Sequence, residues 1–133
     1  MREYALQQTA TLLRRFAFQV NRAARHGNAE AIHDLRVAIR RLSRCLKVFS
    51  QFYPDQHWKR IRRQLSGLME MAGQVRDRDI ALELLAEARV SKSAPVVRRL
   101  EDERRRAAAG LALEIRRWHR QNRSKKWRSS LGL

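Results

Sequence analysis

The chain contains few of the residues that interrupt helices or form cross-links. Its 133 residues include one Cys, two Pro and five Gly. A single Cys excludes an internal disulfide, and Cys45 lies beside an apolar stripe, which indicates a buried and unreactive thiol. No segment alternates apolar and polar residues as a half-buried strand does. We therefore predict an all-α protein.

Long apolar runs and acidic residues are also scarce. No window approaches eighteen apolar residues, and residues 1–16 lack the apolar core of a signal peptide, so we expect a cytoplasmic protein without a membrane segment. Thirteen Asp and Glu stand against thirty Lys and Arg, which gives a formal net charge of +17. Such a charge indicates a polyanionic partner: nucleic acid, polyphosphate or an acidic membrane surface.

Apolar residues recur at spacings of three and four through most of the chain, as in amphipathic helices. Gly27 is placed to end the first helix in a left-handed conformation, and Pro54 ends the second because proline disfavours helical geometry before it. Asp55 and Ser93 are expected to cap the third and fourth helices, with Pro95 in the first turn of the fourth. The predicted helices span residues 3–25, 29–53, 55 to about 88, and 94–120.

Short connections between four helices predict an antiparallel four-helix bundle over residues 1–120. Gly73, inside the third helix, predicts a bend or a close contact with another helix. Arg104 interrupts the apolar stripe of the fourth helix, where a core residue is expected. Residues 121–133 are basic and poor in apolar residues, and we expect them to be only partly ordered.

The second helix carries two stripes that lie roughly 130° apart around its axis at about 100° per residue. Like charges three and four residues apart destabilise a helix by roughly 0.2 to 0.5 kcal/mol per pair, so a polyanion is expected on the basic stripe. From Arg36 to Lys47 there are five cations and no acid, whereas a solubilising surface mixes both signs. The apolar stripe contains Ile32, Leu35, Ile39, Leu42, Leu46 and Phe49, and the basic stripe contains His33, Arg36, Arg40, Arg44 and Lys47.

The sequence offers little for catalysis. It has no glycine-rich phosphate loop, no metal-binding His or Cys spacing and no recognisable nucleophile with its base. Asp77 and Asp79 lie among arginines, so we expect them to be ionised and to orient those arginines. Two residues apart on a helix, they face different directions and suit a metal poorly. We predict no enzyme activity, no metal and no cofactor.

Two segments resemble the CHAD family, the conserved-histidine α-helical domain. Residues 33–42, HDLRVAIRRL, resemble its HxxRVxxRR motif, and residues 73–80, GQVRDRDI, are similar to its GxxRDxDV segment. A weaker match is SKKW at residues 124–127, which resembles a serine, basic and aromatic element after the fourth helix. The three matches span most of the chain.

This resemblance implies binding of inorganic polyphosphate in a basic channel without catalysis. It places Arg76 in the channel from the third helix, with Asp77 holding its guanidinium, and Asp79 is a second orienting carboxylate. Arg41 and Arg44 are expected at the edge. From the second helix the channel residues are His33, Arg36, Arg40 and Lys47, and the candidates chosen by charge and expected facing are Arg62, Arg98, Arg105 and Lys126.

The chain departs from the family pattern at several positions and in length. Ser43 and Ser66 stand where family members usually carry a basic residue, and Ala72 replaces a leucine. A full domain of this family has two similar four-helix halves and this chain supplies about one, which suggests a homodimer that completes the channel. The alternatives are a nucleic-acid-binding, nucleoid-associated helical protein and, less favoured, a polyphosphate or triphosphate hydrolase.

Overall fold

A computed structural model describes all 133 residues, from Met1 to Leu133. It contains five α-helices and one short 3-10 helix, with no strand, which confirms the all-α prediction. No helix is both long enough and apolar enough to cross a lipid bilayer. The elements are α1 (Arg2–Arg25), α2 (Ala29–Val48), η1 (Ser50–Phe52), α3 (Asp55–Glu87), α4 (Pro95–Arg120) and α5 (Arg123–Leu131).

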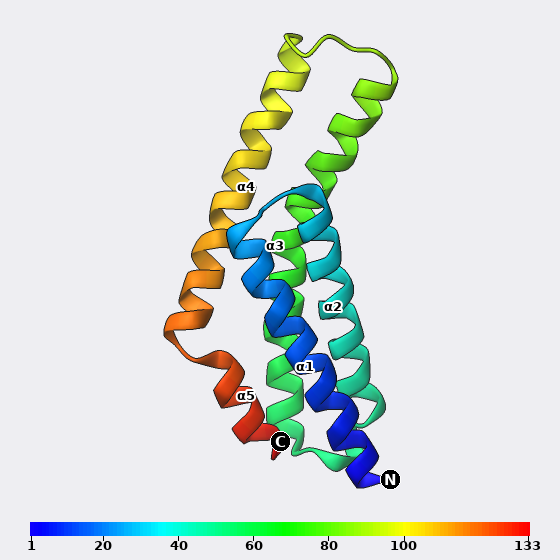
Figure 1. Cartoon of the computed structure of the whole chain (residues 1–133), viewed down its shortest axis with the longest axis vertical. Coiled ribbons are helices and arrows are strands. Elements are labelled where there is room, and N and C mark those ends of the chain that lie inside the picture. The colour runs from blue at the N-terminus through cyan, green and yellow to red at the C-terminus, as the bar shows by residue number, and fades with distance from the viewer.

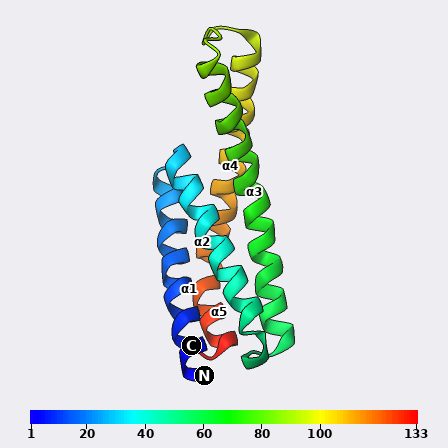
Figure 2. The same ribbon diagram turned by 90° about the vertical axis from the view of Figure 1, so that its right-hand side faces the viewer.

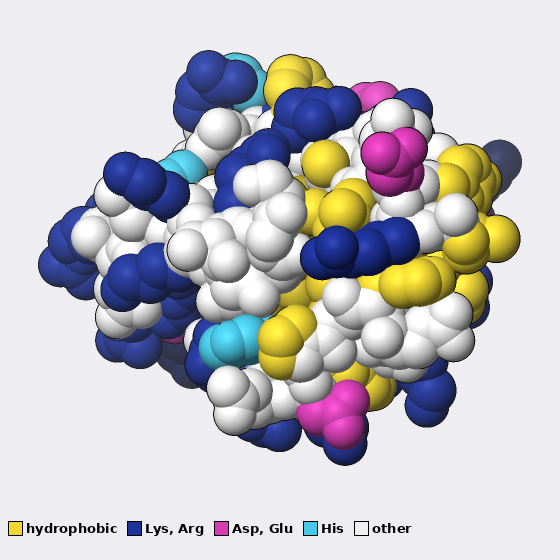
Figure 3. Space-filling view, turned by 90° about the horizontal axis from the view of Figure 1, so that it is seen from below, with side chains coloured by type: hydrophobic (Ala, Val, Ile, Leu, Met, Phe, Trp, Pro, Cys, Tyr) yellow, Lys and Arg dark blue, Asp and Glu magenta, His cyan; other side chains and the backbone are white.

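The first four helices form a bundle in which each helix packs on the next, with α1 against α2, α2 against α3 and α3 against α4. The helices α3 and α4 are longer than the other two, and they extend as a two-helix hairpin beyond the end of α1 and α2 (Figures 1 and 2). Seen from the opposite end of the bundle, hydrophobic side chains gather on one side and Lys and Arg side chains lie around much of the rest (Figure 3).

The helix boundaries follow the sequence closely, but several expected caps are absent. Gly27 does not adopt a left-handed conformation, and Asn28 caps α2 by accepting a hydrogen bond from the backbone N–H of Ala31 at 2.9 Å. Asp55 and Ser93 make no cap hydrogen bond, although Pro95 does begin α4 as predicted. The second helix ends at Val48 rather than Tyr53, and η1 fills the remaining residues before Pro54.

The C-terminal segment is ordered, contrary to the expectation of partial order, because it contributes aromatic packing to the core. Phe16 of α1 stacks on Trp127 of α5 with ring centroids 5.7 Å apart, and Trp118 of α4 meets both rings edge-on. The Trp127 indole N–H also donates a hydrogen bond to Gln64 Oε1 of α3 at 2.8 Å. With Leu131 one turn later, α5 buries a face too short to be recognised as a periodic pattern.

A small polar cluster is buried where α1, α2 and the end of η1 meet. The Thr9 hydroxyl donates to the Ala5 carbonyl at 2.9 Å, accepts from the Tyr53 hydroxyl at 2.6 Å, and lies 3.4 Å from Cys45 Sγ. Burial raises the pKa of the Cys45 thiol and of the Tyr53 hydroxyl. Because the thiolate is the reactive form, the structure agrees with an unreactive thiol at Cys45.

Replacing Trp127 with alanine tests whether α5 belongs to the core. Trp127→Ala removes a buried indole and should lower the free energy of unfolding by about 3 to 5 kcal/mol. Lys126→Ala, at the exposed neighbouring position, should change it by less than about 0.5 kcal/mol. Urea unfolding followed by circular dichroism measures both, and equal effects would mean that α5 does not stabilise the bundle.

Candidate polyanion-binding groove

A basic groove lies between α2 and α3. It contains a hollow of about 290 Å³ whose lining includes three arginines and no carboxylate. Arg62 Nε of α3 donates a hydrogen bond to Ser43 Oγ of α2 at 3.0 Å, which holds the Arg62 side chain across the two helices. The lining residues are Ile39, Arg40, Ser43, Arg44, Arg62, Ser66 and Met69.

Farther along the same groove, the Arg36 guanidinium lies over Gly73. A Cβ atom at Gly73 would lie 3.8 Å from Arg36 Nη2, so the Arg36 side chain reaches from α2 to contact α3 at this glycine. The helix α3 continues through Gly73 without interruption, and of the two expectations, a bend or a close contact, the contact with α2 is found. Arg36 Nε is buried and has no hydrogen-bond partner. A buried N–H left unpaired costs about 1 to 3 kcal/mol, so this donor favours an acceptor brought by a ligand.

The Arg62–Ser43 hydrogen bond and the Arg36–Gly73 contact show how the antiparallel helices α2 and α3 are aligned. His33 lies one turn before Arg36 on α2, and Arg76 lies nearly one turn after Gly73 on α3, so both belong to the same end of the groove. Lys47 lies one turn beyond Ser43 at the other end, at the level of Arg62. The hollow brings together the predicted site residues Arg40, Arg44 and Arg62, and Arg36 lies farther along, over Gly73. Helical spacing places the other three, His33, Lys47 and Arg76, toward the ends of the same groove.

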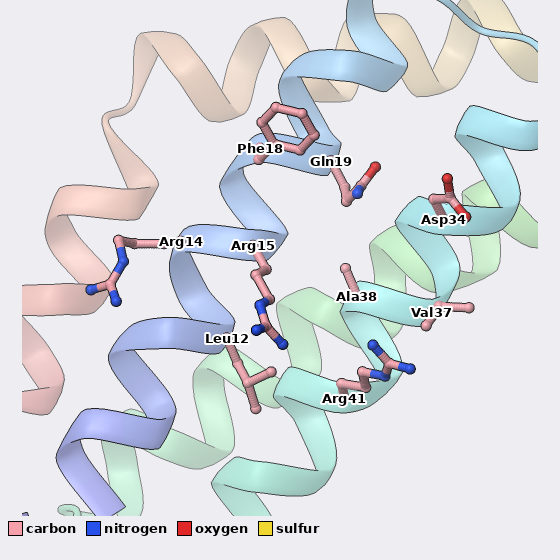
Figure 4. Close-up of a pocket in the computed structure, with 9 residues that line it drawn as sticks. All are labelled: Leu12, Arg14, Arg15, Phe18, Gln19, Asp34, Val37, Ala38 and Arg41. Carbon is pink, nitrogen blue, oxygen red and sulfur yellow. The ribbon is translucent and has the colours of Figure 1, made fainter.

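Arg41 faces a different groove from Arg40. It lines a hollow between α1 and α2, on the other side of α2 (Figure 4). The two residues are adjacent, and about 100° per residue is enough to turn their side chains toward different neighbouring helices. The sequence placed Arg41 at the edge of the channel because its motif does not show where α1 lies.

The candidates from α4 and α5 do not reach the groove. Glu103 of α4 pairs with Arg78 of α3 at 3.3 Å, which identifies the side of α4 that faces α3. Arg98 lines a hollow formed only by residues 93–106, with no residue of α2. Arg105 lies about 160° around α4 from Glu103, is exposed and pairs with Asp102 on the same helix. These two candidates were chosen by charge, and charge does not show which way a helix is turned.

Lys126 is exposed on α5, which contacts α3 through Trp127 and Gln64. Gln64 lies two residues from Arg62, which places the two side chains about 160° apart around α3. The helix α5 is therefore on the opposite side of α3 from the groove, and Lys126 does not face it.

The two predicted orienting carboxylates have different surroundings. Asp77 is exposed and makes no ion pair, so it does not hold the Arg76 guanidinium. Asp79 is 8% exposed and accepts a hydrogen bond from Arg104 Nε at 2.5 Å. Arg104 Nη2 donates to the Gly27 carbonyl at 2.6 Å as well. Asp79 therefore orients an arginine of α4 rather than one of the groove, and this pair explains why Arg104 interrupts an apolar stripe.

The structure contains no group of three or more His, Cys, Asp or Glu side chains placed to hold a metal ion. The groove itself offers guanidinium groups, hydroxyls and an imidazole. Such a set donates hydrogen bonds and positive charge, which suits the oxygens of a phosphate or sulfate chain. The arrangement is therefore one for binding an anion.

Asp79 and Asp77 provide a matched pair for testing the structural ion pair. Asp79→Ala leaves Arg104 without its carboxylate and should lower the free energy of unfolding by about 1 to 3 kcal/mol. Asp77→Ala removes an exposed, unpaired carboxylate and should change it by less than about 0.5 kcal/mol. Thermal and urea unfolding measure both, and a larger effect at Asp77 would contradict the assignment.

Comparison with known proteins bears on the chain as a whole. No curated protein matches it, and no solved structure matches it. The sequence model of the CHAD domain matches residues 7–131, which include all of α2, α3, α4 and α5. Both segments that line the groove, 33–47 and 62–76, fall within the match. The chain belongs to the CHAD domain family.

Proposed function

We propose that the chain binds inorganic polyphosphate along the α2–α3 groove and does not catalyse its hydrolysis. The observation that carries this proposal is Arg36 Nε, a buried donor without a protein acceptor, beside a hollow lined by arginines and no carboxylate. An acceptor-rich anion would supply the missing hydrogen bond. Membership of the CHAD domain family is compatible with this ligand class.

The groove suits an extended anion with a repeated charge. The cations of α2 recur every three or four residues, which corresponds to about 5 to 6 Å along the helix axis. A linear polyphosphate carries roughly one charge per phosphate and can follow such a row from His33 to Lys47. Arginine contacts phosphate oxygens through two parallel N–H groups, which favours a fixed arrangement over loose attraction.

Nucleic acid is the competing ligand class, and the groove suits it less well. Single-stranded nucleic acid is held by aromatic side chains on which the bases stack. The apolar residues in the hollow are Ile39 and Met69, and neither is aromatic. The groove therefore offers contacts to phosphates and no platform for bases.

We also propose that two copies of the chain act together. A groove formed by a single copy is open to solvent on one side, and a second copy beside it would add its own cations to those that attract the anion. A closed two-fold dimer is the commonest form of such an assembly.

The absence of hydrolysis belongs to the same proposal. Enzymes that cleave phosphoanhydrides commonly use carboxylates to hold divalent cations, and the hollow is lined by none. Incubation of polyphosphate with the chain and magnesium or manganese should release no phosphate beyond that of a buffer control.

The double variant Arg36→Ala/Arg40→Ala tests the groove. We expect its affinity for long-chain polyphosphate to fall at least tenfold, because it loses two phosphate contacts that release counterions. The slope of log affinity against log salt should become shallower by a little under two. Titration calorimetry at several salt concentrations measures both quantities.

The matched control is Arg116→Ala/Arg120→Ala, which removes two exposed arginines of the same spacing from α4 and has the same net charge. It should bind polyphosphate within about threefold of the unchanged chain. Equal losses of affinity in the two double variants would mean that polyphosphate binds to the whole basic surface rather than to the groove. Tighter binding of duplex DNA than of polyphosphate would indicate that nucleic acid is the ligand.

A further inference from the structure

A second hollow, of about 350 Å³, lies between α1 and α2 on the side away from α3. Its apolar part includes Leu12 and Phe18 of α1 with Val37 and Ala38 of α2 (Figure 4). The Phe18 side chain is 59% exposed. The polyphosphate proposal leaves these apolar side chains without a role.

The charged part of this hollow is positive. Arg14, Arg15 and Arg41 lie around it, and none of them pairs with a carboxylate. The one acid in the lining, Asp34, is already neutralised by Arg22 at 2.5 Å. An inorganic anion would leave the apolar side chains in water, so the hollow suits an occupant that is acidic and apolar together.

The chain itself presents an acidic and apolar surface on α3. It begins level with the α1–α2 connection, where Arg104 bonds both Asp79 and the Gly27 carbonyl, and continues into the part of α3 that extends beyond α1 and α2 (Figure 2). Asp77, Ile80, Leu84 and Glu87 recur at helical spacing on one face, and Glu83 lies at its edge. Ile80 is 39% exposed and Leu84 is 59% exposed, because no helix of the same chain covers them.

Within residues 77–87 this face carries no cation, and Arg76, one turn before Ile80, belongs to the α2–α3 groove. Arg78 turns toward α4, where it pairs with Glu103, and the remaining acid of the segment, Asp79, is buried against Arg104. Within residues 77–87, the groups that face away from α4 are therefore acidic or apolar. We call these five residues, Asp77, Ile80, Glu83, Leu84 and Glu87, the acidic face of α3.

We propose that the acidic face of α3 from one copy docks into the α1–α2 hollow of a second copy, and that the exchange is reciprocal. Ile80 and Leu84 would cover Phe18 and Val37, while the three carboxylates face the three arginines. Each copy has one hollow and one acidic face, so a two-fold dimer uses both and leaves neither open.

This pairing rests on the proposal that two copies of the chain act together and names their interface. The contact lies on the side of α2 away from the groove, so it does not require polyphosphate. It is also distinct from the α2–α3 groove, because Arg40 lines that groove whereas Arg41 lines the docking hollow. The two ideas can therefore fail separately.

The molar mass of the chain, measured by light scattering without polyphosphate, tests the interface. We expect the mass of two chains for the unchanged protein, and the mass of one chain for Arg41→Glu at the same concentration. The control Arg40→Glu makes the same change of charge at the adjacent position and should keep the mass of two chains. Polyphosphate titration of Arg40→Glu then tests the other groove independently.

A pair of charge-reversed chains gives the sharper result. One variant carries Arg14→Glu, Arg15→Glu and Arg41→Glu, and the other carries Asp77→Lys, Glu83→Lys and Glu87→Lys. All six positions are exposed, and circular dichroism should show unchanged helicity. Each variant alone should have the mass of one chain, because its hollow and its acidic face then have charges of the same sign.

An equimolar mixture of the two variants should recover the mass of two chains, because both interfaces of the mixed dimer then pair opposite charges. The apolar part is tested by Phe18→Ser against Leu113→Ser, whose side chains are 59% and 58% exposed, and only Phe18→Ser should weaken the dimer. A single-chain mass for the unchanged protein at all concentrations overturns the proposal. A two-chain mass that persists in both triple variants also overturns it.

Discussion

The apolar stripe of α2 holds the arginines of the same helix in place. Ile32, Leu35, Ile39, Leu42 and Leu46 are all at most 2% exposed. Full burial of one such side chain contributes about 1.5 to 3 kcal/mol, whereas a like-charge pair on a helix costs roughly 0.2 to 0.5 kcal/mol. Core packing therefore outweighs the repulsion and keeps a row of cations on a fixed helix surface. An anion that binds there meets groups that are already aligned.

Most of the carboxylates that form ion pairs join two helices. Asp34 joins α2 to Arg22 of α1, Glu103 joins α4 to Arg78 of α3, and Asp79 joins α3 to Arg104. None of these pairs involves an arginine that lines the α2–α3 groove. With thirteen acids and thirty Lys and Arg, most cations have no partner within the chain. The placement of the acids thus strengthens the contacts between helices and leaves the groove positive.

The sequence predicted the features that depend on periodicity. It did not predict the features that depend on contacts between helices. The stripes of α2 and the extent of α1 and α3 follow from spacing alone. Trp127 and Leu131 form too short a pattern to indicate α5, and their burial depends on Phe16, far away in the sequence. Likewise, nothing near Arg104 shows that Asp79 and the Gly27 carbonyl lie within reach. The direction in which Arg98 and Arg105 point depends on how α4 is turned against α3.

The adjacent residues Arg40 and Arg41 show how one helix can serve two surfaces. Arg40 lies in the α2–α3 hollow, with arginines, serines and few apolar groups around it. Arg41 lies in the α1–α2 hollow, where apolar side chains share the lining with arginines. The same side chain chemistry thus meets two environments, one suited to an inorganic anion and the other to an acidic helix. A contiguous motif in the sequence therefore does not imply a contiguous site, because the neighbours of each arginine, rather than its place in the motif, determine what it can bind.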